Sequence, residues 1–147
     1  MFFVDSCVLI GAKRKRDRWH SVARPMLEFI ADGRAGIGYI LDYILVEVAN
    51  FLHKKDGPSV AIDAVGDLLV SKYLRIIIVD EIGLLESFEI MKKFKGLSLA
   101  DASIAYYMKL RGIEYLLSFD SRFDRVPWIT RIGSLKELKN IVAFGTS

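Results

Sequence analysis

The segment Phe2-Phe3-Val4-Asp5-Ser6 is a short apolar strand pattern with a carboxylate directly after it. The same pattern returns in Leu116-Leu117-Ser118-Phe119-Asp120. Between these segments, strand-like and helix-like patterns alternate, which is typical of α/β proteins with a mainly parallel sheet. Ligands of such sheets usually bind beyond the carboxyl ends of the strands. We therefore expect Asp5 and Asp120 to lie at the functional edge of the sheet.

Apolar periodicity and turn residues divide the rest of the chain into further elements. Strands are expected at residues 2–4, 37–41, 74–79, 113–119 and 129–132. Helices are expected to begin near Asp17, at Asp42, at Pro58, near Leu84, at Ser98 and at Ser134. Pro25 either kinks the first of these helices or marks its true start. Because no linker or repeat interrupts the pattern, residues 1–147 are expected to form a single domain.

The composition is that of a globular protein with its own core. Of the 147 residues, 52% are hydrophobic, which is enough for a core without disulfides or a structural metal. The single cysteine, Cys7, favours a reducing compartment. Neither a signal peptide nor an apolar run of roughly 18 to 20 residues is present, so we expect a cytoplasmic protein without a membrane segment. The mean hydropathy of +0.30 indicates that a partner covers some apolar surface.

Four acidic residues stand beside or inside apolar segments, where an isolated carboxylate is costly. They are Asp5, Glu47, Asp101 and Asp120. Hard cations such as Mg²⁺ and Mn²⁺ take oxygen ligands, so convergence of these acids would form a metal site. Glu47 is the hardest to explain as a plain surface residue, because aliphatic residues surround it in the sequence. Asp124 is a candidate for a further ligand.

Each of the aspartates also has a structural alternative. Asp5 can cap the turn after its strand, and Asp101 can complete a capping box at the start of its helix. Asp120 can pair with Arg122 in a turn. Asp124 can form an ion pair with a nearby arginine. The residues alone leave the metal site and these alternatives open.

The order of the motifs resembles the PIN-domain nucleases, in particular the VapC-type toxins of prokaryotic toxin-antitoxin pairs, over nearly the whole chain. The family's opening aspartate and small hydroxyl residue match Asp5-Ser6, and its helical glutamate matches Glu47. Its helix-start aspartate matches Asp101, and its late Thr/Ser-x-Asp motif matches Ser118-Phe119-Asp120-Ser121-Arg122-Phe123. Serine replaces the commoner threonine at position 118 and preserves the hydroxyl.

The resemblance implies a three-layer α/β/α fold around a mainly parallel sheet of four or five strands. It also implies a Mg²⁺- or Mn²⁺-dependent endoribonuclease that acts as a homodimer and is inhibited by a cognate VapB-type antitoxin. The expected catalytic residues and metal ligands are Asp5, Glu47, Asp101 and Asp120. The cleavage would be an in-line attack by an activated water on a phosphodiester of RNA.

The segment Lys13-Arg14-Lys15-Arg16-Asp17-Arg18 holds five of the 21 basic side chains in a protein with a net charge of +3. It follows the first strand, so it is expected to hold the RNA backbone near the metal, with Trp19 stacking on a base. The alternative is a solvated charge run with Trp19 packed against its own helix. The full set of expected substrate contacts is Ser6, Lys13, Arg14, Lys15, Arg16, Arg18 and Ser118.

Three other functions compete with the toxin. A PIN-domain RNA-processing nuclease outside toxin-antitoxin systems would carry the same acids. A non-catalytic PIN-like module would use the fold to bind RNA or protein. A phosphotransfer or phosphatase fold would use Asp5 as a covalent nucleophile. Cys7, where those folds have a second aspartate, and the helical Glu47 disfavour this last function.

Overall fold

Five parallel strands form the sheet that carries the candidate acids. The structure is a computed structural model that describes residues 1–145. Its strands are β1 (Phe2–Val4), β2 (Gly38–Leu41), β3 (Leu74–Ile77), β4 (Tyr115–Leu117) and β5 (Thr130–Ile132). They lie in the order β3-β2-β1-β4-β5, and every pairing is parallel. This sheet confirms the expected α/β class.

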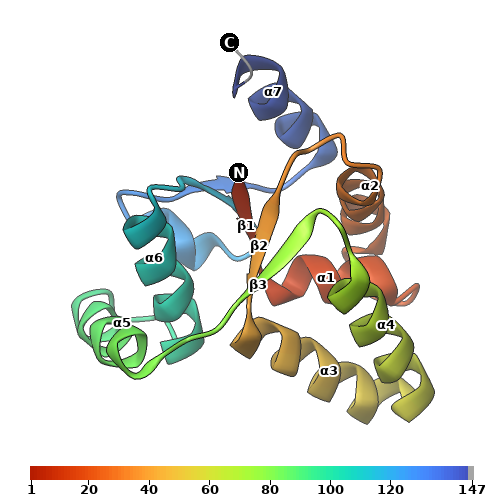
Figure 1. Cartoon of the computed structure of the whole chain (residues 1–147), viewed down its shortest axis with the longest axis horizontal. Coiled ribbons are helices and arrows are strands. Elements are labelled where there is room, and N and C mark those ends of the chain that lie inside the picture. Colours follow the sequence, from red (N-terminus) through yellow and green to blue (C-terminus); the bar gives the residue numbers. More distant parts are fainter. Residues whose placement is uncertain (146–147) are drawn as a thin grey trace.

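Helices cover both faces of the sheet, which gives the predicted three-layer arrangement (Figure 1). One face carries α1 (Ser6–Lys13), α2 (His20–Ala31), α3 (Asp42–Asp56) and α4 (Pro58–Val70). The other face carries α5 (Glu81–Lys93) and α6 (Leu99–Arg111). The 3₁₀ helix η1 (Ser121–Arg125) follows β4, and α7 (Leu135–Gly145) packs against α2. None of the helices within residues 1–145 combines the length and apolar character needed to cross a membrane.

The winding of the sheet reverses between β1 and β4. The chain first moves outward from β1 through β2 to β3, then crosses to the other side of β1 to form β4 and β5. Such a reversal leaves a crevice at the carboxyl ends of the two strands, where α/β proteins bind ligands. Asp5 directly follows β1 and Ser118 directly follows β4, so both lie at this point.

The buried sheet explains why the strands are so apolar. Phe2, Phe3 and Val4 of β1 are each 1% exposed, because helices cover both faces of a parallel sheet. Helix α6 packs on the sheet through buried side chains such as Ile104 and Met108. It ends at Gly112, whose φ of 65° is left-handed and carries no Cβ penalty. The sequence had predicted this helix end.

Several local predictions were wrong. Helix α1 was missed, because residues 7–10 look like a continuation of the first strand, although Asp5 supplies an N-cap that starts a helix. Of the two alternatives for Pro25, only the helix start is excluded, because α2 begins at His20 and contains Pro25. Strands β3 and β4 are shorter than expected, and η1 was not foreseen. All of these errors concern boundaries or short elements, so the order of the main elements is unaffected.

Candidate functional site

Asp5 is the buried acid at the centre of the site. It is 5% exposed and serves as the N-cap of α1, whereas its structural alternative was the cap of a turn. The Ser6 amide donates to Asp5 Oδ1 at 2.8 Å, and the Ser118 hydroxyl donates to Oδ2 at 2.7 Å. The Cys7 thiol also donates to Oδ2, at 3.5 Å. These donors fix the carboxylate. Each carboxylate oxygen has two lone pairs, so Oδ1, which accepts one hydrogen bond, keeps a lone pair for a cation, whereas Oδ2 already accepts two.

The environment of Asp5 disfavours its charged form. Burial raises the pKa of Asp5 to about 6, and the nearby charge of Asp101 acts in the same direction. The hydrogen bonds from Ser118 and Ser6 lower the pKa but do not offset the burial. A buried acid beside a second acid is stabilised in its charged form by a cation, and such perturbed groups concentrate at functional sites.

Asp101 lies in the first turn of α6 and completes the predicted capping box. The Asp101 amide donates to Ser98 Oγ at 3.1 Å, and the Ser98 amide donates to Asp101 Oδ2 at 3.1 Å. Within residues 1–145, Asp101 Oδ1 accepts no hydrogen bond. The cap therefore occupies one oxygen of this carboxylate and leaves the other available beside Asp5.

Asp120 is paired with Arg122, also as its structural alternative predicted. Arg122 Nη2 donates to Asp120 Oδ2 at 2.6 Å, and Arg122 Nε lies 3.1 and 3.0 Å from Oδ1 and Oδ2. These hydrogen bonds lower the pKa of Asp120. In turn, Asp120 raises the pKa of Arg122, with smaller contributions from Asp101 and Asp5. The guanidinium thus bonds to Asp120 and lies near enough to Asp101 and Asp5 for their charges to act on it.

Glu47 and Asp124 make no direct contact with these three acids. Glu47 is exposed on α3, and its side chain forms no hydrogen bond or ion pair with any other residue in 1–145. Its aliphatic neighbours in sequence did not bury it, because Ile44 and Val48 face the core from another side of the helix. Asp124 is paired with Arg131 through contacts of 2.9 and 3.1 Å. Asp124 therefore forms an ion pair, as its structural alternative predicted.

The chemistry of the site fits a hard divalent cation. Asp5, Asp101 and Asp120 supply carboxylate oxygens, and such oxygens are the ligands that Mg²⁺ and Mn²⁺ prefer. In the described part of the chain, no three acidic, histidine or cysteine side chains lie close enough together to hold an ion as they stand. Arg122 donates to both oxygens of Asp120, so that carboxylate is occupied by a guanidinium. The assignment of the four acids as ligands stays a prediction.

The basic loop, residues 13–18 between α1 and α2, has two kinds of basic side chain. Two of them are ion-paired to helices of the same face: Lys13 to Asp67 at 2.9 Å and Arg14 to Asp56 at 2.8 Å. Lys15 and Arg16 are exposed and have no ion pair within residues 1–145. The structure therefore uses the first two to anchor the loop and leaves the next two facing solvent.

An aromatic stack joins the basic loop to the acidic edge. The rings of Trp19 and Phe119 are stacked, with centroids 4.5 Å apart and planes at 16°. The Arg18 guanidinium lies 4.7 Å from the centre of the Trp19 ring. Phe119 stands between Ser118 and Asp120 in the chain. An exposed or packed Trp19 was expected from the sequence, but its partner Phe119 was not, because nothing local links two residues a hundred positions apart.

Comparisons with known proteins agree with this fold. The family model of the PIN domain matches residues 2–129. The structure of VapC20 from Mycobacterium tuberculosis, described as a sarcin-ricin loop cleaving toxin, is similar with a TM-score of 0.77 at 19% identity, over 88% of this chain and 97% of that one. A comparison with curated protein sequences found no significant match.

Two toxin-antitoxin complexes are similar as well. VapBC2 from Rickettsia felis, bound to a DNA fragment of its promoter, gives a TM-score of 0.66 at 18% identity, over 89% of this chain and 96% of that one. A toxin-antitoxin complex from Klebsiella pneumoniae gives a TM-score of 0.65 at 20% identity, over 88% of this chain and 96% of that one. At this identity the solved structures establish the fold. Since the family model covers most of the chain, including all four predicted acids, the chain belongs to the PIN domain family.

Proposed function

We propose that this protein is a divalent-metal-dependent endoribonuclease that acts as the toxin of a VapBC-type pair. Its family and its fold, which VapC toxins share, support a VapC-type nuclease. The observation that carries the proposal is the arrangement of Asp5, Asp101 and Asp120 around one guanidinium beside the switch point between β1 and β4. Like charges are gathered in this way where a cation is to be bound.

The residues of the chain prepare the site for in-line hydrolysis. Asp5, Asp101 and Asp120, with Glu47 reaching from α3, would hold Mg²⁺ or Mn²⁺, which when bound activates water and stabilises developing negative charge. Ser118 fixes the orientation of the Asp5 carboxylate through Oδ2. The N-terminus of α6 favours the negative charge of Asp101. Hydrolysis by water leaves a 5′ phosphate and a 3′ hydroxyl and does not use the RNA 2′ hydroxyl.

The basic loop would hold the RNA. Lys15, Arg16 and Arg18 are the exposed cations of the loop, and Lys15 and Arg16 make no contact with an aromatic ring, so these two are the first candidates for RNA phosphates. The stack of Trp19 and Phe119 lies next to Asp120 and offers an aromatic surface to a base beside the scissile phosphate. Because VapC20 is described as cleaving the sarcin-ricin loop, a structured ribosomal RNA is the first substrate to test.

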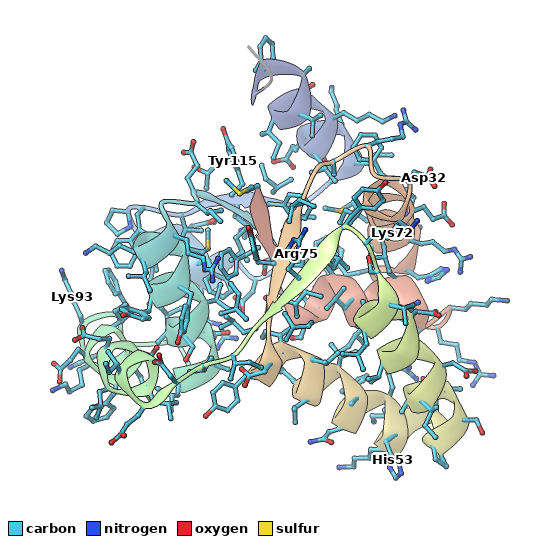
Figure 2. All side chains as sticks on the ribbon, viewed as in Figure 1. Asp32, His53, Lys72, Arg75, Lys93 and Tyr115 are labelled. Atoms are coloured by element: carbon cyan, nitrogen blue, oxygen red, sulfur yellow. The ribbon has the colours of Figure 1, made fainter. Side chains whose placement is uncertain are left out.

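We assign the groove between α3 and α4 to the antitoxin. This groove has a volume of about 580 Å³, and apolar side chains dominate its lining: Ala49, Ala61, Ile62, Val65 and Leu69. Ile62 is 70% exposed. Figure 2 shows His53, which also lines the groove, at the outer end of α3. A concave apolar groove suits an amphipathic helix of a partner.

Basic residues near one end of the groove favour a partner with acidic residues. Pro58 lines the groove, and nearby Val60 and Asp56 line a second hollow together with the basic loop. A partner segment that leaves the groove at this end therefore meets Lys15 and Arg16. An antitoxin with an apolar helix followed by acidic residues would fill the groove and cover the RNA-binding cations at the same time.

We assign the exposed stripe on α5 to a second copy of this chain. The stripe is formed by Ile82, Leu85 and Phe88, which are 66%, 61% and 50% exposed, and Ile78 precedes it. A protruding helix stripe can pair with itself about a two-fold axis, which is the commonest symmetry of oligomers. Covering such apolar surface is favourable. The proposal thus includes a homodimer, and a cytoplasmic location, which the lone Cys7 favours.

Brief expression of the wild-type protein, followed by mapping of newly formed RNA ends, tests this function. The proposal predicts a small set of cleaved sites in structured RNA that disappear with Asp5→Asn, and rescue by a small antitoxin encoded beside the gene. Cleavage without a neighbouring antitoxin gene would favour an RNA-processing PIN nuclease instead. RNA binding without new ends would favour a non-catalytic module.

A further inference from the structure

Arg122 holds a position between the two segments that carry Asp120 and Asp101. Its Nη1 donates to the Gly96 carbonyl at 3.2 Å, in the loop that leads to Ser98 and α6. Its Nε and Nη2 bind both oxygens of Asp120. The side chain nevertheless remains 55% exposed, against 24% for that of Asp120. The guanidinium is therefore well bonded but free to leave toward solvent.

These contacts have a cost for cation binding. Mg²⁺ and Mn²⁺ would need at least one oxygen of Asp120, yet Arg122 donates to both. The carboxylates of the described chain do not form a three-ligand cluster in this arrangement. Asp120 must be released before it can act as a ligand together with Asp5 and Asp101.

We propose that Arg122 is a built-in occupant of the cation site, which competes with the metal for Asp120 and turns to the RNA phosphate when the metal binds. This inference rests on the proposed function. The guanidinium neutralises the acids while no cation is bound. Once a divalent ion takes Asp120, the planar fork of Arg122 is free, and its geometry matches a phosphate as well as a carboxylate.

A neighbouring arginine provides a matched control. Arg125 lies on the same helix η1, and its Nη1 donates at 3.2 Å to the Lys95 carbonyl of the same loop. Within residues 1–145, Arg125 binds no carboxylate. Arg122→Gln and Arg125→Gln therefore remove the same charge from the same element, and only Arg122→Gln removes the contact with Asp120.

The first test is Mn²⁺ binding measured by calorimetry without RNA. We expect Arg122→Gln to lower the Kd for Mn²⁺ by about fivefold, because the metal no longer has to displace one partly exposed ion pair from Asp120. Arg125→Gln is expected to change it less than twofold. With RNA and saturating Mn²⁺, Arg122→Gln is expected to raise KM more than Arg125→Gln does, because a phosphate contact is lost. Equal Mn²⁺ affinities for the two variants would overturn the inference.

The second test uses the unaltered protein, so it does not depend on a variant folding. The Nε–H signals of arginines are followed by NMR during a Mg²⁺ titration, with Arg122→Gln used for assignment. The Arg122 signal is expected to shift with the same Kd as Mg²⁺ binding, while that of Arg14, paired with Asp56, stays in place. Mg²⁺ binding with an undisturbed Arg122 signal overturns this inference alone. Absence of any Mg²⁺ or Mn²⁺ binding overturns the proposed function with it.

Discussion

The Ser118 hydroxyl donates to Asp5 Oδ2 at 2.7 Å across the ends of the two central strands. Ser118 is completely buried, and its oxygen also accepts the Asp120 amide at 3.1 Å. One hydroxyl thus connects the acid that follows β1 with the acid that follows β4. The parallel pairing of Val4 with Leu117 brings these residues together.

Removing this hydroxyl is expected to destabilise the protein. Ser118→Ala leaves the buried Asp5 Oδ2 with only the longer contact from the Cys7 thiol, which costs about 1 to 3 kcal/mol in the free energy of unfolding at pH 7.5. Because the hydroxyl lowers the pKa of Asp5, its loss also raises that pKa above about 6. Urea unfolding measures the first effect, and Ser118→Thr, which keeps the hydroxyl, is the control. Equal losses in both variants would show that packing and not the hydrogen bond is responsible.

The pKa of Asp5 predicts a pH-dependent effect of Asp5→Asn. The folded protein holds the Asp5 proton up to about pH 6, whereas the unfolded chain releases it near 3.8. Stability is therefore lost as pH rises from 3.8 to about 6, by up to about 3 kcal/mol, and asparagine avoids this loss. In metal-free buffer, Asp5→Asn should gain stability relative to wild type at pH 7.5 but little at pH 4. A gain that is the same at both pH values would contradict the burial argument.

Two different substitutions of Asp101 are expected to separate its role as a helix cap from its proposed role as a metal ligand. Asp101→Asn keeps an acceptor for the Ser98 amide and removes the charge beside Asp5, so its stability should stay within about 0.5 kcal/mol of wild type. Asp101→Ala loses the cap and should cost about 0.5 to 2 kcal/mol. Both variants should lose Mn²⁺ binding, measured by calorimetry. A variant that binds Mn²⁺ as wild type does would remove Asp101 from the ligand set.

The basic loop should show a division between its anchoring and its RNA-binding residues. Replacing Lys15 and Arg16 by glutamine should weaken RNA binding and lower the slope of log K against log salt by about 1.4, or about 0.7 for each lost phosphate contact. Replacing Lys13 and Arg14 by glutamine removes the ion pairs with α4 and α3. This variant should therefore unfold at a lower temperature than wild type, while its salt slope should change less than that of the Lys15 and Arg16 variant. Filter binding at several salt concentrations measures both slopes. A larger slope change for the Lys13 and Arg14 variant would reverse the assignment.

Much of the fold could be predicted because its signals are local. Ser98 and Gly112 bound α6 through a capping box and a left-handed C-terminal residue, and both were recognised in the sequence. The order of strands and helices followed from apolar periodicity. Helix α1 was missed because its apolar residues suit a strand equally well, and tertiary packing decides between the two.

The site was only partly predictable, for a different reason. The sequence indicated which acids flank strands and helix starts, but not where their side chains point. Glu47 is exposed because the helix turns it away from Ile44 and Val48. The pairing of Trp19 with Phe119 and the bridge from Arg122 to Gly96 join segments that are distant in sequence. Contacts of this kind depend on the assembled fold.

In the proposed function, the acids beside the switch point hold a divalent cation for the cleavage of RNA. The most direct test is the incubation of the purified full chain with a structured ribosomal RNA in Mn²⁺, beside Asp101→Asn, with the chemistry of the new 5′ ends determined. We expect discrete cuts with 5′ phosphates, which are abolished by a chelator and by Asp101→Asn in a protein that is still folded. Cleavage that survives both treatments, or that leaves 5′ hydroxyl ends, would contradict it.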